Sequence, residues 1–301
     1  MTATTQGRWL PIAAIGVTLF FWASAFVAIR HLGEQVGPGA LTLGRLVVGS
    51  VALGAFLLTR PRRWPARGDW PALVACGLLW FGIYNVALNE GERRVDAGTA
   101  AMLIQIAPVL IAILATVFLR ERMTRYLGAG LVLAFGGVLL IGLSASGGGN
   151  RDVLGVVLCV VSAATYAVSM VLQKPLLSRL SALELTWFAC TIGAIACLPF
   201  AGDLVGTVRE IPLSSVIWIV YLGVFPTAIA FTTFAYALAR VDASQLGVTT
   251  YLVPPITIVL GWLFLREAPP VLAIVGGIVC LVGVAVARVR PRALDRVLEE
   301  A

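Results

Sequence analysis

Residues 94–121 read RVDAGTAAMLIQIAPVLIAILATVFLRE, and residues 240–267 read RVDASQLGVTTYLVPPITIVLGWLFLRE. The two stretches align without a gap at an offset of 146 residues and are identical at ten of 28 positions. The shared positions are Arg94, Val95, Asp96, Ala97, Pro108, Leu114, Phe118, Leu119, Arg120 and Glu121. Gly130 and Gly137 continue the match as Gly276 and Gly283. Self-similarity at a fixed offset is typical of a repeat architecture, so we interpret the chain as two copies of one unit.

The composition of the chain places this repeat in a membrane. The 301 residues are 59% hydrophobic and only 12% charged, and the mean hydropathy is +0.96. A soluble domain carries about 25% charged residues, because polar side chains must cover its surface. The composition therefore excludes soluble enzymes, disordered proteins and disulfide-rich proteins, and it predicts a polytopic membrane protein.

The hydrophobic runs predict an all-α polytopic membrane protein with ten transmembrane helices. The predicted spans are 9–30, 39–59, 71–89, 97–119, 126–144, 153–173, 183–201, 213–237, 243–265 and 270–288. Each copy of the repeat holds five spans, and an odd number inserts the second copy upside down relative to the first. We therefore expect two inverted five-helix repeats, which recur in secondary transporters with the binding site at their interface. The expected division is 1–145 for the first repeat, 146–151 for a glycine-rich linker, 152–290 for the second repeat and 291–301 for a cytoplasmic tail.

The positive charges predict the orientation of the chain. Fifteen of the 22 Lys and Arg residues fall on one set of span ends and six on the other, while Arg45 lies within a span. Because short cytoplasmic loops are enriched in Lys and Arg, this bias predicts that both termini are cytoplasmic. The net charge of +7 is not arranged as the basic stripe of a nucleic-acid-binding surface, so we expect no nucleic-acid partner.

The repeated motif resembles the EamA family of the drug/metabolite transporter superfamily. Each copy has a fourth helix with a mid-span proline, then Phe-Leu-Arg-Glu, then a glycine-rich fifth helix, and both Phe21–Phe26 (FWASAF) and Arg45 fit the family. The chain looks most like the YddG-type exporters of aromatic amino acids. The resemblance implies export of small metabolites across a bacterial-type inner membrane by alternating access, with aromatic and other amino acids as the expected substrates. Drugs or toxic organic cations such as methyl viologen are the alternative.

Two proline-containing helices supply the first candidate site residues. Pro108 and Pro254 occupy equivalent positions, and each removes a backbone hydrogen bond, so we expect them to kink their helices and act as hinges. Gln105 and Tyr251, also equivalent, lie beside the carbonyl groups that the prolines free. Free carbonyl groups at membrane depth are tolerated only against protein or a wet cavity. The pair therefore either lines a central cavity or bonds to a neighbouring helix.

The third and first spans of the first repeat carry further candidates. Asn85 and Asn89 lie four residues apart and share a helix face, with Tyr84 beside them. Because amides are costly in lipid, this face should point into the bundle, either as interhelical contacts or as cavity lining. Trp22 and Tyr166, related at an offset of 144, would place two aromatic rings near the pseudo-symmetry axis. Such rings either pack against one another or offer a stacking surface to an aromatic substrate.

Arg45 is the only charge well inside a predicted span. A charge at the centre of a bilayer costs about 2.5–3.5 kcal/mol, so such a residue is expected to have a partner or a function. Three alternatives stand: the Arg45 side chain extends to the outer end of its helix, it pairs with Glu34 or Glu90, or it binds the carboxylate of an amino acid.

None of the 15 acidic residues falls mid-membrane, and the only histidine, His31, ends the first span. We therefore expect no catalytic acid–base pair and no metal-ligand set, and we predict that the chain is not an enzyme and needs no metal or cofactor. The lack of a buried carboxylate favours zwitterions or neutral aromatic molecules over permanent cations. A small-molecule substrate and the lipid bilayer are the expected partners, and the internal repeat makes a monomer sufficient for function.

Overall fold

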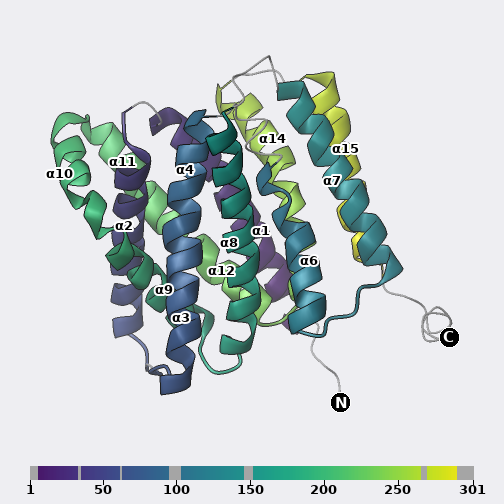
Figure 1. Cartoon of the computed structure of the whole chain (residues 1–301), viewed down its shortest axis with the longest axis horizontal. Coiled ribbons are helices and arrows are strands. Elements are labelled where there is room, and N and C mark those ends of the chain that lie inside the picture. Colours follow the sequence, from purple (N-terminus) through teal and green to yellow (C-terminus); the bar gives the residue numbers. More distant parts are fainter. Residues whose placement is uncertain are drawn as a thin grey trace.

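The structure is a bundle of helices (Figure 1). The computed structural model describes residues 6–32, 35–61, 63–94, 103–145, 152–265 and 270–289, and no strand occurs within these ranges. Val95–Met102, Glu34, Glu267, the predicted linker and the predicted tail lie outside the described residues. The α-helices are α1 (Gln6–Leu32), α2 (Pro38–Leu58), α3 (Trp70–Cys76), α4 (Tyr84–Arg94), α6 (Ala107–Phe118), α7 (Arg125–Ala145), α8 (Val153–Leu176), α9 (Ala182–Ala196), α10 (Ala201–Glu210), α11 (Leu213–Leu222), α12 (Ala230–Leu238), α13 (Ala243–Thr249), α14 (Val253–Leu265) and α15 (Val271–Ala287).

Six continuous helical stretches of the described chain are long and apolar enough to cross a bilayer. A seventh is obtained if α9 and the following residues 198–210, which bend by 56°, are taken as one span. Three further apolar helical stretches of the described chain are shorter: Ala107–Phe118, Arg125–Ile141 and Val271–Ala287. The chain is thus an all-helical, multi-pass membrane protein, and the number of ten spans remains a prediction.

The helix boundaries repeat at the offset of 146 found in the sequence. The starts of α4, α6 and α7 at residues 84, 107 and 125 correspond to the starts of α12, α14 and α15 at 230, 253 and 271. Two π-helical segments, Gly77–Ile83 and Gly223–Ile229, also begin at the same offset. The two copies therefore share helix boundaries and local distortions as well as sequence.

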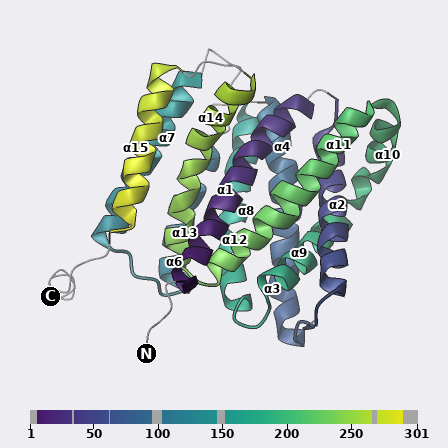
Figure 2. The same cartoon turned by 180° about the vertical axis from the view of Figure 1, so that it is seen from behind.

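The last helices of the two copies, α7 and α15, pack side by side at one end of the molecule (Figures 1 and 2). Gly130 lies against Gly283, and Gly137 lies against Gly276, so the two helices run antiparallel. The Cys280 thiol lies 3.3 Å from the carbonyl oxygen of Ala134, its equivalent in the other copy. Small residues let helix backbones approach closely in membranes. The equivalent helices thus meet about a pseudo-two-fold axis, with opposite chain directions.

Other helix pairs are related by the same pseudo-two-fold axis. Helix α1 packs on α12 as α8 packs on α4, and α1 packs on α14 as α8 packs on α6. Likewise, α2 contacts the π-helical segment Gly223–Ile229, while α9 contacts Gly77–Ile83. Each helix of one copy therefore finds its main neighbours in the other copy, so neither copy buries its core alone.

The repeated motif itself joins the two halves. Glu121, which ends the motif in the first copy, accepts hydrogen bonds from the backbone amides of Ala243 and Ser244 at 2.6 and 2.9 Å and from the Ser244 hydroxyl at 2.6 Å. It caps the start of α13, where the motif of the second copy begins. Lys174 of α8 donates to the carbonyl groups of Leu238 and Val241 nearby. Phe-Leu-Arg-Glu and Arg-Val-Asp-Ala are therefore structural partners across the repeats.

A second polar junction ties α4 to the start of α8. Asp152 caps α8 by accepting from the amide of Leu154 at 2.8 Å, and it pairs with Arg94 at 3.2 Å. Arg94 also pairs with Glu90 at 2.8 Å. The Leu154 amide and the Arg94 guanidinium hold the pKa of the Asp152 carboxyl below its ordinary value. This junction fixes the end of α4 by charge-assisted hydrogen bonds.

Five predicted spans are less regular than the sequence suggested. The third and eighth contain the π-helical segments, the fourth is interrupted by a turn at Gln105 and Ile106, and the ninth by a 3₁₀ turn at Thr250–Leu252. The seventh, predicted over 183–201, ends at Ala196 and bends at Leu198–Phe200 into α10. Pro199 cannot donate a backbone hydrogen bond, which favours a break at this point. Helix α10 has no equivalent in the first copy, where α2 ends at Leu58.

Candidate functional site

An aromatic cluster occupies the centre of the bundle. It comprises Trp22 of α1, Trp80 within the first π-helical segment, Tyr84 at the start of α4, Tyr166 of α8, and Phe231 and Phe234 of α12. Trp80 stacks on Tyr166 with ring centroids 5.0 Å apart. Trp22 meets the edge of Tyr166 at 6.3 Å, and Tyr84 lies 6.0 Å from the same ring. The structure thus brings together Trp22, Tyr84 and Tyr166, which the sequence proposed from two different copies.

Several buried polar side-chain atoms, with Trp22 Nε1 and Tyr166 Oη of the cluster among them, form no hydrogen bond in the described part of the chain. Five buried polar atoms of described side chains form no hydrogen bond: Trp22 Nε1, Tyr166 Oη, Ser169 Oγ, Gln173 Nε2 and Tyr251 Oη. Tyr166 also approaches the side chain of Thr250, without a hydrogen bond of normal geometry. Buried polar groups are nearly always bonded, so an unpaired set calls for an explanation. Donors and acceptors left free beside stacked rings are suited to a ligand with both apolar and polar parts.

Arg45 lies deep in α2, and its side chain is almost fully enclosed, with 6% of the residue exposed. Its Nε donates to the Thr227 hydroxyl at 3.0 Å, and that hydroxyl donates to the carbonyl of Leu222 at 2.8 Å. Tyr84 and Cys190 are also close to the guanidinium. Arg45 is therefore held by a neutral hydroxyl on the second π-helical segment.

The prediction that Arg45 pairs with Glu90 is wrong. Glu90 pairs with Arg94 at 2.8 Å instead, because both residues lie on α4 four positions apart, where their side chains meet on one face. Glu34 lies outside the described residues. Across the part of the chain that the structure describes, no carboxylate forms an ion pair with Arg45. The positive charge is buried with only partial compensation, a costly arrangement in the absence of an anion.

The two asparagines bind protein groups. The Asn85 side-chain amide donates to the carbonyl groups of Trp80 and Phe81, both at 3.0 Å, and so occupies acceptors of the π-helical segment. The Asn89 amide donates to the Thr42 hydroxyl at 3.1 Å and links α4 to α2. The face does point inward as predicted, since both residues are buried. Their side-chain amide nitrogens therefore form contacts within and between helices in this structure.

The two prolines begin helices and do not kink continuous ones. Pro108 lies in the first turn of α6, directly after a turn at Gln105, and Pro254 lies in the first turn of α14, directly after the 3₁₀ turn that contains Tyr251. A proline is tolerated at the first helical turn because its missing amide would be unpaired there anyway. The expected kinks are therefore helix breaks at equivalent positions.

Gln105 and Tyr251 are both buried, at 7% and 0% exposure. Tyr251 packs with the apolar residues between α7 and α15, away from the aromatic cluster. The neighbouring Thr250 is the residue that faces Tyr166. The structure thus places Tyr251 beside the central site and outside the group of rings that forms it.

Sequence reasoning missed Thr227 and the two π-helical segments. Short π-helical insertions often occur at functional sites. Each segment begins at a glycine that packs against a helix of the other copy: Gly77 against Ile192 of α9, and Gly223 against Val48 of α2. The equivalence of Gly77 and Gly223 at the offset of 146 was the available signal.

Comparison with known proteins identifies this architecture. The model of the EamA-like transporter family matches the chain twice, over residues 9–143 and 153–289. The chain belongs to the EamA-like transporter family. The two matches coincide with the two copies of the repeat, so the resemblance drawn from the motif is confirmed at the level of the family.

Relatives of the transporter cover most of its length. It is 38% identical over 271 residues to the "Probable terminal-alkyne amino-acid exporter" of Streptantibioticus cattleyicolor, covering 90% of this chain and 91% of that protein. It is 34% identical to the uncharacterized transporter YdfC of Bacillus subtilis, covering 87% and 86% of the two chains. A solved crystal structure superposes with a TM-score of 0.78 at 22% identity, over 97% of this chain and 99% of that one. That likeness supports the fold alone.

The family assignment settles the class of the protein. It is a multi-pass membrane transporter of small molecules, related to exporters, and not an enzyme. The aromatic cluster and the buried Arg45, with Tyr84 close to both, form its candidate transport site.

Proposed function

We propose that this transporter exports amino acids, with aromatic and other apolar side chains preferred, through a central cavity that opens alternately to either side of a bacterial-type inner membrane. The observation that carries the proposal is Arg45, a buried cation whose described partners include no carboxylate. A substrate carboxylate would supply the missing charge through a bidentate pair. The relative named as an amino-acid exporter supports the same class.

The aromatic cluster provides the second half of the substrate site. Trp22, Tyr84 and Tyr166 lie on the helices that surround the centre, and Tyr84 is close to both Arg45 and Tyr166. An apolar or aromatic side chain would pack on these rings, where each favourable ring pair adds about 0.5–1.5 kcal/mol beyond burial. The unpaired Nε1 of Trp22 and Oη of Tyr166 would hydrogen-bond to the polar part of the substrate.

Purified protein in liposomes tests the substrate class. Labelled phenylalanine, tryptophan, threonine and methionine should show protein-dependent flux, and phenylalaninamide, which lacks the carboxylate, should not compete. Arg45→Gln should lower the flux at least about tenfold, since losing one charge-assisted contact costs about 1.5–3 kcal/mol. Arg60→Gln, at an exposed arginine beside Phe56, is the matched control. An absence of flux for all four amino acids in the wild-type protein contradicts the amino-acid class.

A buried arginine also argues against the alternative substrates. A permanent cation such as methyl viologen would be repelled by Arg45 in a site of low dielectric. If cells that express the protein became resistant to methyl viologen and the purified protein showed no amino-acid flux, organic cations would be favoured over amino acids as the substrates.

We further propose that the helix breaks before Pro108 and Pro254 are the bending points of alternating access. Half-helices that meet at a break can rotate without losing continuous backbone hydrogen bonds. The double variant Pro108→Ala with Pro254→Ala should lower the transport rate, because both breaks would tend to close into regular helix. If the rate and the accessibility of both faces are unchanged, the hinge proposal is wrong.

The topology that we propose has ten spans, both termini in the cytoplasm and a functional monomer. Helix α1 begins and α15 ends at the same end of the bundle (Figure 2), which supports an even number of crossings. The charge bias of the loops supports the cytoplasmic side. Reporter fusions at successive loops would test the number and direction of the spans.

A further inference from the structure

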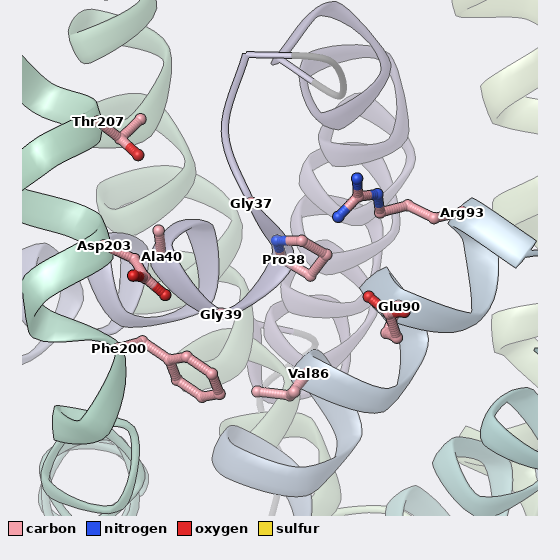
Figure 3. Close-up of a pocket in the computed structure, with 10 residues that line it drawn as sticks. All are labelled: Gly37, Pro38, Gly39, Ala40, Val86, Glu90, Arg93, Phe200, Asp203 and Thr207. Carbon is pink, nitrogen blue, oxygen red and sulfur yellow. The ribbon is translucent and has the colours of Figure 1, made fainter. Parts of the chain in front are cut away.

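A separate cavity of about 330 Å³ lies at the end of the bundle where α2 begins. Its walls come from the start of α2, the end of α4 and one side of α10 (Figure 3). Small-molecule sites have volumes of about 300–1,000 Å³, so a single amino acid fits. The lining residues are Gly37, Pro38, Gly39, Ala40, Val86, Glu90, Arg93, Phe200, Asp203 and Thr207.

Opposite charges face this cavity from two sides. Figure 3 shows Arg93 on α4 at one side and Asp203 on α10 at the other, with Phe200 and Val86 between and below them. Arg93 and Asp203 form no ion pair in the described part of the chain, whereas Glu90 is neutralised by Arg94 at 2.8 Å. The cavity thus offers one open positive group, one open negative group and an apolar floor.

The start of α2 adds hydrogen-bond donors on the positive side. No side chain caps this helix, so the first backbone amides after Pro38 are unpaired. The positive end of the helix dipole favours a carboxylate there. The arrangement matches a zwitterion whose ammonium group meets Asp203 and whose carboxylate meets Arg93 and the α2 amides.

The cavity and the Arg45 site lie along the same two helices. Arg45 is seven residues beyond Pro38 on α2, or about 10 Å along the axis. Between them, Asn89 of α4 donates to Thr42 of α2 at 3.1 Å. Both side chains are buried, so this contact separates the cavity from the centre of the bundle.

We propose that this cavity is a second, peripheral binding site for zwitterionic amino acids, a vestibule on the transport path beyond the Asn89–Thr42 contact. The proposal rests on the proposed function, since it assigns a second position to the same substrate class. Helix α10, which supplies Asp203 and has no equivalent in the first copy, makes the vestibule a feature of one end of the transporter.

Cysteine protection tests the vestibule directly. The five native cysteines are all buried, so Thr207→Cys introduces an accessible thiol into the wall of the cavity. The purified variant is placed in nanodiscs, where both faces meet a membrane-impermeant methanethiosulfonate reagent. Phenylalanine should slow the labelling several-fold, while phenylalaninamide and 3-phenylpropionate, which each lack one charge, should not. Glu210→Cys, exposed on the same helix outside the cavity, is the control and should show no slowing.

Two further variants identify the groups involved. Adding Asp203→Asn or Arg93→Gln to Thr207→Cys should abolish the protection by phenylalanine. Adding Arg45→Gln should lower liposome flux at least about tenfold but preserve the protection, because the vestibule is a separate site.

The outcomes distinguish the two proposals. Protection that survives both charge substitutions, equal slowing at the Glu210→Cys control, or protection lost with Arg45→Gln each overturns the vestibule. Wild-type flux without any protection at Thr207→Cys also overturns it and leaves the proposed function intact. Protection without wild-type flux of any amino acid supports the vestibule and contradicts the proposed export.

Discussion

At the scale of single residues, the hydroxyl of Thr227 decides where the buried charge lies. It accepts from Arg45 Nε at 3.0 Å and donates to Leu222 O at 2.8 Å, so one oxygen anchors a guanidinium to the wall of the bundle. Arginine has a rigid fork of five donors, and fixing Nε leaves the outer edge of the fork for a second acceptor. Thr227 is thus a positioning residue for the carboxylate that we expect at Arg45.

Replacing this hydroxyl gives the prediction at the residue scale. Thr227→Val keeps the volume but removes the acceptor, which leaves a buried charged donor unpaired at a cost of about 1–3 kcal/mol. We expect KM for phenylalanine to rise several-fold, with a smaller change in kcat, in a liposome flux assay. Thr227→Ser retains the oxygen and should restore KM. If Thr227→Val changes only the thermal stability and leaves KM unaltered, Thr227 has a structural role alone.

At the scale of elements, close contact between α7 and α15 depends on which glycine faces the partner helix. A Cβ atom at Gly137 would lie 2.6 Å from the backbone nitrogen of Cys280 and the oxygen of Gly276, whereas one at Gly136 would meet no atom within 4 Å. Two adjacent glycines of one helix therefore have opposite roles. One permits close approach, and the other only lowers helix propensity.

This contrast gives a paired prediction. Gly137→Ala forces α7 and α15 apart and should destabilise the protein by about 1–3 kcal/mol, as overpacking does. Gly136→Ala should be neutral or stabilising by up to about 1 kcal/mol, because alanine is the better helix former. Thermal unfolding of both variants in the same detergent measures the difference. Equal melting temperatures would contradict the close packing of the two helices.

At the scale of the whole molecule, the two copies are joined by groups that the repeat motif places at its ends. Glu121 of the first copy caps α13 of the second through three hydrogen bonds. Glu267 of the second copy and Ala97 of the first, the residues equivalent to Glu121 and Ala243, lie outside the described residues. The motif is therefore explained by assembly of the halves, and it needs no role in substrate binding.

The last prediction concerns this junction. Glu121→Gln exchanges a carboxylate that accepts three hydrogen bonds for an amide with one acceptor oxygen, and hydrogen bonds to charged groups contribute about 1.5–3 kcal/mol. We expect a lower melting temperature, while Glu210→Gln, at an exposed glutamate, should leave it unchanged. A melting temperature equal to that of the wild type would show that the Glu121 cap does not contribute to holding the halves together.

Much of the fold was predictable from the sequence because its signals are local. Hydrophobic runs predict membrane helices, and identity at an offset of 146 predicts two copies whose helices begin at equivalent residues, as α4 and α12 do. The inward face of Asn85 and Asn89 and the meeting of Trp22 with Tyr166 followed from helical spacing and the repeat. The π-helical segments, the bend after Ala196 and the packing of Tyr251 among residues of α7 and α15 did not, because they depend on packing against the other copy.

The sequence by itself determined that this chain is a two-copy, helical membrane transporter, since composition, period and repeat are properties of neighbouring residues. Only the tertiary structure decided which groups are left unpaired. The sequence allowed an ion pair between Arg45 and Glu90. In the structure, Glu90 pairs with Arg94 on its own helix, and Arg45 donates a hydrogen bond to Thr227, 182 residues away. The free energy of a buried charge depends on every group around it, and those groups come together only when both copies have folded.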